Sequence, residues 1–302
     1  MSSINITFST CLYQLKNRHG KSLHIEWMRG FIQIVKRFYL VIYTDHETSL
    51  IIHDEMNKIQ NKAIKSNIKV VIKPYTEFYN NKYADFWKRN NENPNCKLYD
   101  TTDWRLNMLW CEKVHFVHQT MTGNYFDRAT EYYGWCDIGY FRDTLAKSTS
   151  DYANIIREHW PNTEKINRLN KNLVYYGCNV KPDHIKFALK YHFQYFDPSK
   201  TNAVADIPSE VYNKKAHFIS GGFFITSREK MKWWIDTFQT ALEKHMEQNA
   251  VIQDDQQIIS YCVFKNYMSA TSDQDHKVHY CIMKVNETQP DKLWFMFRDI
   301  LL

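Results

Sequence analysis

The sequence predicts one α/β domain over residues 1–302, with a mostly parallel, Rossmann-like central sheet flanked by helices. Short apolar stretches typical of buried strands alternate with stretches whose apolar residues recur at helical spacing, the pattern of a parallel sheet with crossover helices. A length of 302 residues lies at the upper end of what a single hydrophobic core serves. Hydrophobic residues make up 44% of the chain and aromatic residues 16%, enough apolar surface to offset the entropy of ordering the backbone.

The alternation is clearest in the first part of the chain. Residues 4–13 are predicted as the first strand, and residues 25–35 as a helix because apolar side chains recur there at helical spacing. Residues 38–44, rich in aromatic and β-branched side chains, form the second predicted strand. A helix over 51–64 and a strand over 68–72 complete this part. Ligands of such sheets lie beyond the carboxyl ends of the strands, so the residues that follow each strand are the first binding candidates.

Past residue 142 the pattern becomes less regular. The later predicted elements are a loop at 90–95, a helix over 104–121, an aromatic strand over 132–141, a strand-like segment over 173–180, a helix over 183–196, a polar surface loop over 197–215, a strand over 218–226 and a helix to about residue 248. Thr226 and Glu229 are predicted to form the capping box of that last helix. Its apolar stripe indicates core packing and not a cofactor site.

Net charge restricts the class of ligand. The formal charge of +6 and the pI near 8.7 fit an anionic ligand such as a nucleotide diphosphate, and they also fit weak binding to nucleic acid. Lys and Arg alternate with acids along most of the chain, and no arginine-rich arm, zinc finger or RNA-recognition signature is present. We therefore expect no nucleic-acid partner.

Cysteine usage and hydropathy indicate the compartment. The seven cysteines are odd in number and scattered, without a C-x-x-C pair, which indicates free thiols in a reducing compartment. Residues 1–13 lack the basic start and apolar run of a signal peptide, and no segment approaches the roughly 20 apolar residues that span a bilayer. We expect a cytoplasmic protein, and a peripheral membrane contact through faces bearing Lys and Trp stays open.

Asp137 is the most informative residue, because it stands in an aromatic segment whose other members favour burial. A buried carboxylate is unfavourable unless it meets a cation, a metal or hydrogen-bond donors. Pairing with Arg142 or with backbone amides at a strand end is the structural alternative to a functional role.

Lys113 is the second candidate, because it lies one heptad beyond Leu106 on the apolar side of its predicted helix. A lysine on an inward-facing stripe needs an anion, and a diphosphate at the edge of the sheet would supply one. The alternative is a side chain whose stem packs on apolar surface while its ammonium reaches solvent.

Two short motifs in the second half allow both structural and functional readings. Gly221 and Gly222 interrupt a strand, which indicates close approach of a ligand or another backbone, or a simple β-bulge. Asp254 and Asp255 precede an apolar run, so they can cap a helix, or they can act as catalytic general base or bind acceptor hydroxyls.

Three further residues are weaker candidates. Asp45 follows the second predicted strand and can bind a ribose or base edge, or begin a turn. His276 and His279 lie in a late polar segment, and one of them could complete a metal site with Asp137. A solvated histidine is the alternative for each.

The order of these motifs resembles the HtrL/YibB family. The resemblance rests on five segments spread over most of the chain: the strand from Asn5 to Thr10, the helix ending near Lys113, the segment from Trp135 to Arg142, Gly221-Gly222-Phe-Phe, and Asp254-Asp255-Gln256. That family is similar to GT-A glycosyltransferases. The resemblance implies a GT-A-like fold, a nucleotide-binding half over 1–145 and a less regular acceptor-binding half over 146–302.

The resemblance also implies a mechanism. It places the base and ribose of a UDP- or GDP-sugar near Thr10, Tyr13 and Asp45, and the diphosphate near Lys113 and Arg142. Stabilising the leaving phosphate would be the main catalytic task. The acceptor is expected to be a carbohydrate or glycoconjugate, as in polysaccharide biosynthesis.

The remaining site residues are implied in the same way. Gly221 and Gly222 would let the donor sugar approach the backbone, and Asp254 or Asp255 would contact the acceptor or act as base. Many relatives hold Mn²⁺ or Mg²⁺ through an Asp-x-Asp motif, which would make Asp137 a metal ligand. This chain has Asp137-Ile138-Gly139, with a single carboxylate, so a metal requirement stays open, as does a binding protein with impaired catalysis. A nucleotide-binding enzyme of another class is a further alternative, although the chain lacks the Walker A and G-x-G-x-x-G motifs.

Overall fold

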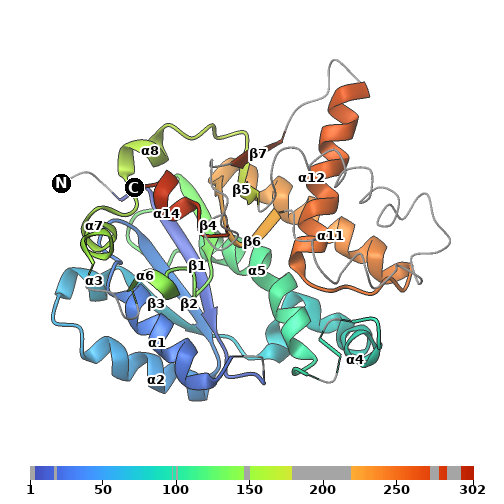
Figure 1. Cartoon of the computed structure of the whole chain (residues 1–302), viewed down its shortest axis with the longest axis horizontal. Coiled ribbons are helices and arrows are strands. Elements are labelled where there is room, and N and C mark those ends of the chain that lie inside the picture. The colour runs from blue at the N-terminus through green and yellow to red at the C-terminus, as the bar shows by residue number, and fades with distance from the viewer. Residues whose placement is uncertain are drawn as a thin grey trace.

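The computed structural model describes residues 4–16, 19–96, 98–99, 101–145, 150–178, 219–272, 279–283 and 294–302. Its centre is a seven-stranded sheet with the order β3-β2-β1-β4-β6-β5-β7 (Figure 1). The strands are β1 (Ile6–Leu12), β2 (Tyr39–Thr44), β3 (Ile68–Ile72), β4 (Tyr132–Cys136), β5 (Val174–Cys178), β6 (Ile219–Ser227) and β7 (Tyr280–Met283). Strand β6 is antiparallel to both neighbours, and the other paired strands are parallel. The expected α/β fold with a mostly parallel central sheet is confirmed.

Helices cover both faces of this sheet. They are α1 (Lys21–Ile32), α2 (His46–Asn57), α3 (Lys62–Ser66), α4 (Ala84–Glu92), α5 (Arg105–Thr122), α6 (Arg142–Leu145), α7 (Asp151–His159), α8 (Thr163–Asn167), α11 (Arg228–Glu247), α12 (Asp255–Ser272) and α14 (Phe297–Ile300), with short 3₁₀ turns η1 (Tyr75–Glu77) and η2 (Tyr79–Tyr83). In Figure 1, α4, α11 and α12 lie to the right of the sheet, α3 and α7 lie to its left, and α1 and α2 lie below it.

Two hydrophobic clusters follow from the alternation of side chains along the strands. In β2, Val41 and Tyr43 join the cluster that includes α5, α11 and α12, whereas Leu40 and Ile42 join the cluster that includes α1 and α7. Successive side chains of a strand point to opposite faces, so a strand buried on both sides is apolar throughout. This is why residues 38–44 have no polar-apolar alternation.

Local capping explains where the elements differ from the sequence expectation. The helix expected over 51–64 is two helices: Asp45 caps α2 by accepting the backbone N–H of Thr48 at 2.7 Å, and Asn61 caps α3. The cap of α11 is Ser227, which accepts the backbone N–H of Lys230 at 3.1 Å, so the assignment to Thr226 was wrong by one residue. The expected helix over 183–196, the loop over 197–215 and His276 lie outside the described residues.

The aromatic strand ends earlier than expected. Strand β4 stops at Cys136, and the backbone N–H of Tyr140 then bonds the carbonyl of Asp137 at 2.8 Å, which forms a turn. Asp137 is therefore the first residue beyond the carboxyl end of a central strand, and not the middle of a strand.

Gly134 permits the tight packing of β4 between β1 and β6. A Cβ atom at this position would lie 2.3 Å from the carbonyl oxygen of Phe224 and 3.1 Å from the ring of Phe8. We expect Gly134→Ala to lower the free energy of unfolding by about 1–3 kcal/mol, because the backbone contact cannot relax without shifting the sheet. Urea unfolding measures this, with Gly20→Ala as control, since a Cβ there meets only Ser22 Oγ at 3.9 Å. Equal stability of the two variants would contradict the packing.

Candidate active site at the carboxyl end of β4

The ammonium of Lys113 joins three elements of the fold. Its Nζ lies 3.2 Å from Asp137 Oδ1 and 3.1 Å from Asp255 Oδ2, and it donates a hydrogen bond of 3.0 Å to the carbonyl oxygen of Gly221. Helix α5 supplies the lysine, the turn after β4 supplies Asp137, α12 supplies Asp255, and β6 supplies Gly221. We call these four residues the Lys113 cluster. It unites the strongest sequence candidates from both halves of the chain.

Asp137 is the member of the cluster that solvent reaches. Its backbone N–H bonds the carbonyl of Gly222 at 2.9 Å, and its Oδ1 accepts a hydrogen bond from the indole N–H of Trp135 at 2.5 Å. The side chain keeps 35% of its surface exposed, whereas that of Asp255 keeps 6%. Asp137 is thus fixed by three partners on its inner side and open to a ligand on the other.

The two glycines of β6 make room for these carboxylates. A Cβ at Gly221 would lie 2.8 Å from Asp255 Oδ2, and a Cβ at Gly222 would lie 3.0 Å from the indole nitrogen of Trp294 and 3.2 Å from Asp137 Oδ2. The sequence predicted close approach of a ligand or another backbone at these glycines. In the structure the atoms that approach them belong to side chains. A ligand contact at either glycine remains a prediction.

Burial and charge set the protonation of the cluster. Burial alone would lower the pKa of Lys113, but the Asp137 and Asp255 carboxylates outweigh it and raise that pKa, so the ammonium is charged. Burial raises the pKa of Asp255 from an ordinary 3.8 to about 7, and the Asp254 and Asp137 carboxylates add to the rise against the attraction of Lys113. Asp255 therefore titrates near neutrality.

This shift predicts a pH-dependent stability. Between pH 4 and 7 the folded protein holds the proton on Asp255 and the unfolded chain has lost it, so stability contributed by this group falls as pH rises. The slope is at most about 1.4 kcal/mol per pH unit. Because Asn stays neutral, Asp255→Asn should gain stability relative to the wild type between pH 5 and pH 8. Urea unfolding at both values measures it, and a pH-independent difference would refute the shift.

Asp254 has a different role from its neighbour. Its Oδ1 accepts the backbone N–H of Gln257 at 3.3 Å, the geometry of a helix cap, and the side-chain amide of Gln256 donates to Oδ2 at 3.2 Å. The residue is 3% exposed. Of the two readings left open by the sequence, capping describes Asp254, and the expected catalytic role is not supported for it. Asp255 belongs to the Lys113 cluster, where burial removes it from an acceptor hydroxyl.

Of the three residues expected around a base and ribose, two are buried and Asp45 is partly exposed. Thr10 is fully buried in β1, and the buried Tyr13 donates its hydroxyl to the carbonyl of Lys73 at 2.8 Å. Both are buried residues of the core, so a role of Thr10 and Tyr13 beside the base and ribose remains a prediction. Asp45 caps α2 but stays partly exposed after the end of β2.

Tyr75 is a candidate residue that the sequence did not single out. It is half-buried, the guanidinium of Arg105 lies 4.5 Å from its ring centroid, and the Asp45 carboxylate contributes to the upward shift of its pKa, which burial dominates. The Asp45 carboxylate is therefore close enough to Tyr75 to act on its charge. An aromatic ring beside a carboxylate suits a nucleoside, since the ring stacks on a base and the carboxylate accepts ribose hydroxyls.

The guanidinium of Arg142 lies among aromatic rings. Its guanidinium is 5.4 Å from the centroid of Trp27 and 4.7 Å from that of Phe295. His24 lies 4.8 Å from Trp27, and burial lowers the pKa of His24, with Arg142 adding to the decrease and Asp137 opposing it. The sequence left open that Arg142 is the partner of Asp137. In the structure the cation that pairs with Asp137 is Lys113. Arg142 and Trp27 are half-exposed beside Asp137.

His279 and Asp137 lie at opposite ends of the strands of the sheet. It precedes β7, and its carbonyl accepts the backbone N–H of Val174, the first residue of β5. Its Nδ1 is 2.6 Å from Lys230 Nζ, and its ring packs 4.3 Å from Trp233. Since β5 and β7 run in the direction of β4, their amino ends are remote from its carboxyl end. The expected metal pair of Asp137 and His279 was therefore wrong.

The residues around Asp137 do not fit a divalent cation. The oxygens of Asp137, Asp255 and Gly221 converge on the ammonium of Lys113, so a positive charge of the chain itself occupies the point where a metal would be held. Within the described ranges, no three His, Cys, Asp or Glu side chains are grouped as metal ligands.

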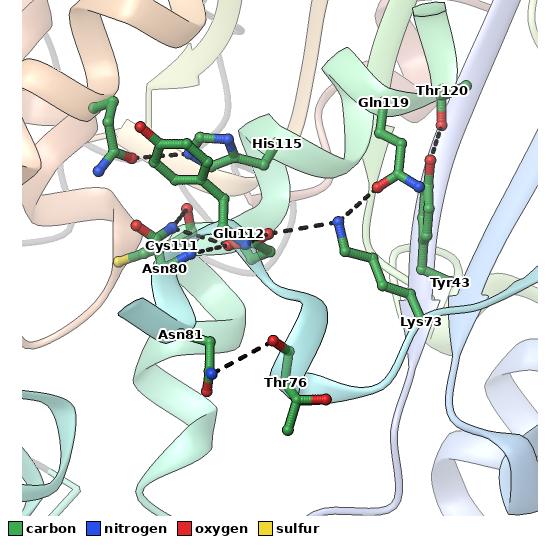
Figure 2. Close-up of polar contacts among 12 residues, drawn as sticks. Tyr43, Lys73, Thr76, Asn80, Asn81, Cys111, Glu112, His115, Gln119 and Thr120 are labelled. Atoms are coloured by element: carbon green, nitrogen blue, oxygen red, sulfur yellow. Dashed lines mark hydrogen bonds and ion pairs between the residues drawn. The ribbon is translucent and has the colours of Figure 1, made fainter. Parts of the chain in front are cut away.

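A second polar network anchors α5 one residue before Lys113 (Figure 2). Glu112 is fully buried and accepts the backbone N–H groups of Tyr79 at 2.7 Å and Asn80 at 3.1 Å. Lys73 Nζ lies 3.9 Å from Glu112 and donates to Gln119 Oε1 at 2.6 Å. Burial raises the pKa of Glu112 to about 7. The network ties η2 to α5 and so fixes the helix that carries Lys113.

Comparisons with known proteins give a likeness to a solved structure. No protein-family model and no curated protein matches the chain. The chain is similar to the solved structure of the galactosyltransferase LgtC in complex with donor and acceptor sugar analogues, at 10% identity and a TM-score of 0.45, over 98% of this chain and 95% of that chain. Among the described helices, none has the length and apolar character needed to cross a membrane.

Proposed function

We propose that the chain is a glycosyltransferase that moves a sugar from a UDP- or GDP-sugar to a hydroxyl of a carbohydrate or glycoconjugate acceptor. The observation that carries the proposal is the exposed carboxylate of Asp137, held by Lys113 at the carboxyl end of a central strand. Ligands of open α/β sheets bind at that edge. The resemblance to the HtrL/YibB family, for which no family model matches the chain, remains a prediction.

The nucleotide is assigned to the edge that runs from β2 to β4. Tyr75 would stack on the base, and Asp45 would accept hydrogen bonds from ribose hydroxyls. Arg142, the half-exposed guanidinium beside Asp137, would bind the diphosphate, because planar guanidinium donors match phosphate oxygens. Thr10 and Tyr13 would support this surface from the core.

The chemistry is assigned to Asp137 and Lys113. The bond between the anomeric carbon and the diphosphate oxygen breaks, and its electron pair stays on the diphosphate. A new bond forms between the anomeric carbon and the acceptor oxygen, whose proton passes to the Asp137 carboxylate. The Lys113 ammonium offsets the charge that develops on the leaving diphosphate. Asp255 acts as a positioning residue, because it holds Lys113 and is itself buried.

A thermal-shift panel of UDP- and GDP-sugars tests the donor assignment. A ligand that binds only the native state at about 100 times its Kd adds about 2.7 kcal/mol of stability, so at least one donor should raise the melting temperature clearly. Asp45→Ala should reduce that shift, and Asp54→Ala, on the exposed side of α2, serves as control. A panel without any shift would reject the donor assignment. The cytoplasmic location, any peripheral membrane contact and a role in polysaccharide biosynthesis remain predictions.

A further inference from the structure

The ammonium of Lys113 has the surroundings of a bound cation. It carries three N–H donors, and three oxygens from three different elements lie within 3.2 Å of it. The ring of Trp135 adds a cation–π contact at 5.7 Å. Lys113 is 7% exposed, so these partners and not water satisfy its charge.

The same oxygens would suit a divalent cation. Carboxylate and carbonyl oxygens are the ligands that Mg²⁺ and Mn²⁺ take in proteins. An ammonium at the point of convergence repels a second cation and uses the lone pairs that would coordinate it. The cluster can therefore hold either the ammonium or a metal ion at this point.

We propose that Lys113 is a built-in substitute for a divalent cation, so that this chain binds its donor without a metal. Removing the ammonium while keeping the carboxylates should convert the cluster into a metal site. The donor part of this proposal rests on the proposed function, whereas the metal part stands on the geometry of the Lys113 cluster alone.

The unequal exposure of the two carboxylates around Lys113 supports its role in place of a metal ion. Asp137 and Asp255 both pair with the ammonium of Lys113. The side chain of Asp255 is buried, whereas that of Asp137 reaches solvent. In a site of low dielectric the ammonium acts strongly on charge that develops nearby. Its positive charge is covalently attached and needs no cation from solution.

Calorimetric titration of MnCl₂ and MgCl₂, without nucleotide, tests the metal part on the full chain. The wild type should show no saturable binding that depends on Asp137. Lys113→Ala should bind Mn²⁺ at least tenfold more tightly than the wild type, and Lys113→Ala with Asp137→Asn should lose that gain. Wild-type Mn²⁺ binding that Asp137→Asn abolishes would overturn the proposal, and so would a folded Lys113→Ala variant with no gain.

A second measurement uses only the wild type. It therefore tests the proposal even if Lys113→Ala does not fold. The Kd of the donor found in the thermal-shift panel should agree within about twofold between EDTA and 1 mM Mn²⁺. Binding at least tenfold tighter in Mn²⁺ would overturn the proposal. Absence of donor binding in both conditions would reject the proposed function instead, and the wild-type Mn²⁺ titration would still decide whether the Lys113 cluster accepts a metal.

Discussion

Asp137→Asn is expected to lower the rate of sugar transfer at least about 100-fold in a protein that folds normally. The amide keeps the shape of the side chain and can still accept the indole N–H of Trp135. It loses the negative charge that pairs with Lys113 and the ability to take the acceptor proton. Loss of a general base typically lowers the rate by about 10² to 10⁴.

The transfer assay should resolve kcat from the donor KM. Because Lys113, Arg142 and the nucleotide surface remain, kcat should fall while the donor KM changes only a few-fold. Asp143→Asn is the matched control, since Asp143 is a nearby exposed carboxylate in the first turn of α6. Transfer by Asp137→Asn at the rate of this control would remove Asp137 from the chemistry.

Lys113→Met is expected to have the second large effect, on both transfer and stability. The substitution keeps a long apolar stem but removes the ammonium that Asp137 and Asp255 share, so Asp255, whose pKa burial already raises, must bind a proton or stay charged without its partner. Breaking a buried pair by removing one partner typically lowers the free energy of unfolding by about 3–5 kcal/mol. Binding of a nucleoside diphosphate should weaken more than binding of the nucleoside, because only the former carries the charge that the ammonium offsets.

A double variant separates the two effects. Lys113→Met combined with Asp255→Asn also removes the buried acid that has lost its partner, so it should recover much of the lost stability. Transfer should stay at least about 100-fold below the wild type, because the ammonium that stabilises the leaving diphosphate is still missing. Recovery of transfer together with stability would make Lys113 a purely structural residue.

The central site residues could be predicted from the sequence because burial is costly for charge. Asp137 in an aromatic segment and Lys113 on an apolar helical face both require a partner, and they are each other's partner. The glycines of β6 were informative for a different reason. Glycine weakens a strand, so its presence there often indicates that another group lies close to the backbone. Periodicity located the strands well because strands buried on both faces are apolar throughout.

Other residues depend on tertiary geometry that no local pattern contains. Asp254 and Asp255 are adjacent and chemically identical, and only the direction of α12 decides that one caps the helix and the other meets Lys113. The sequence allowed His279 to join Asp137 in a metal site. The direction of the strands places the two residues at opposite ends of the sheet's strands. Tyr75 and Trp27 are two of many aromatics, and only the tertiary packing of η1 and α1 brings Tyr75 within electrostatic reach of Asp45 and Trp27 to Arg142.

Turnover of the donor is the measurement that tests the central claim most directly. The panel of UDP- and GDP-sugars is incubated with the wild type and with Asp137→Asn, with and without a mixture of carbohydrate acceptors, and release of nucleoside diphosphate is followed. The account predicts that the wild type releases the diphosphate from at least one donor, faster with acceptor, and that Asp137→Asn releases it at least about 100-fold more slowly. Donor binding without any release by the wild type would instead indicate a binding protein, and equal release by both proteins would contradict a site built on Asp137.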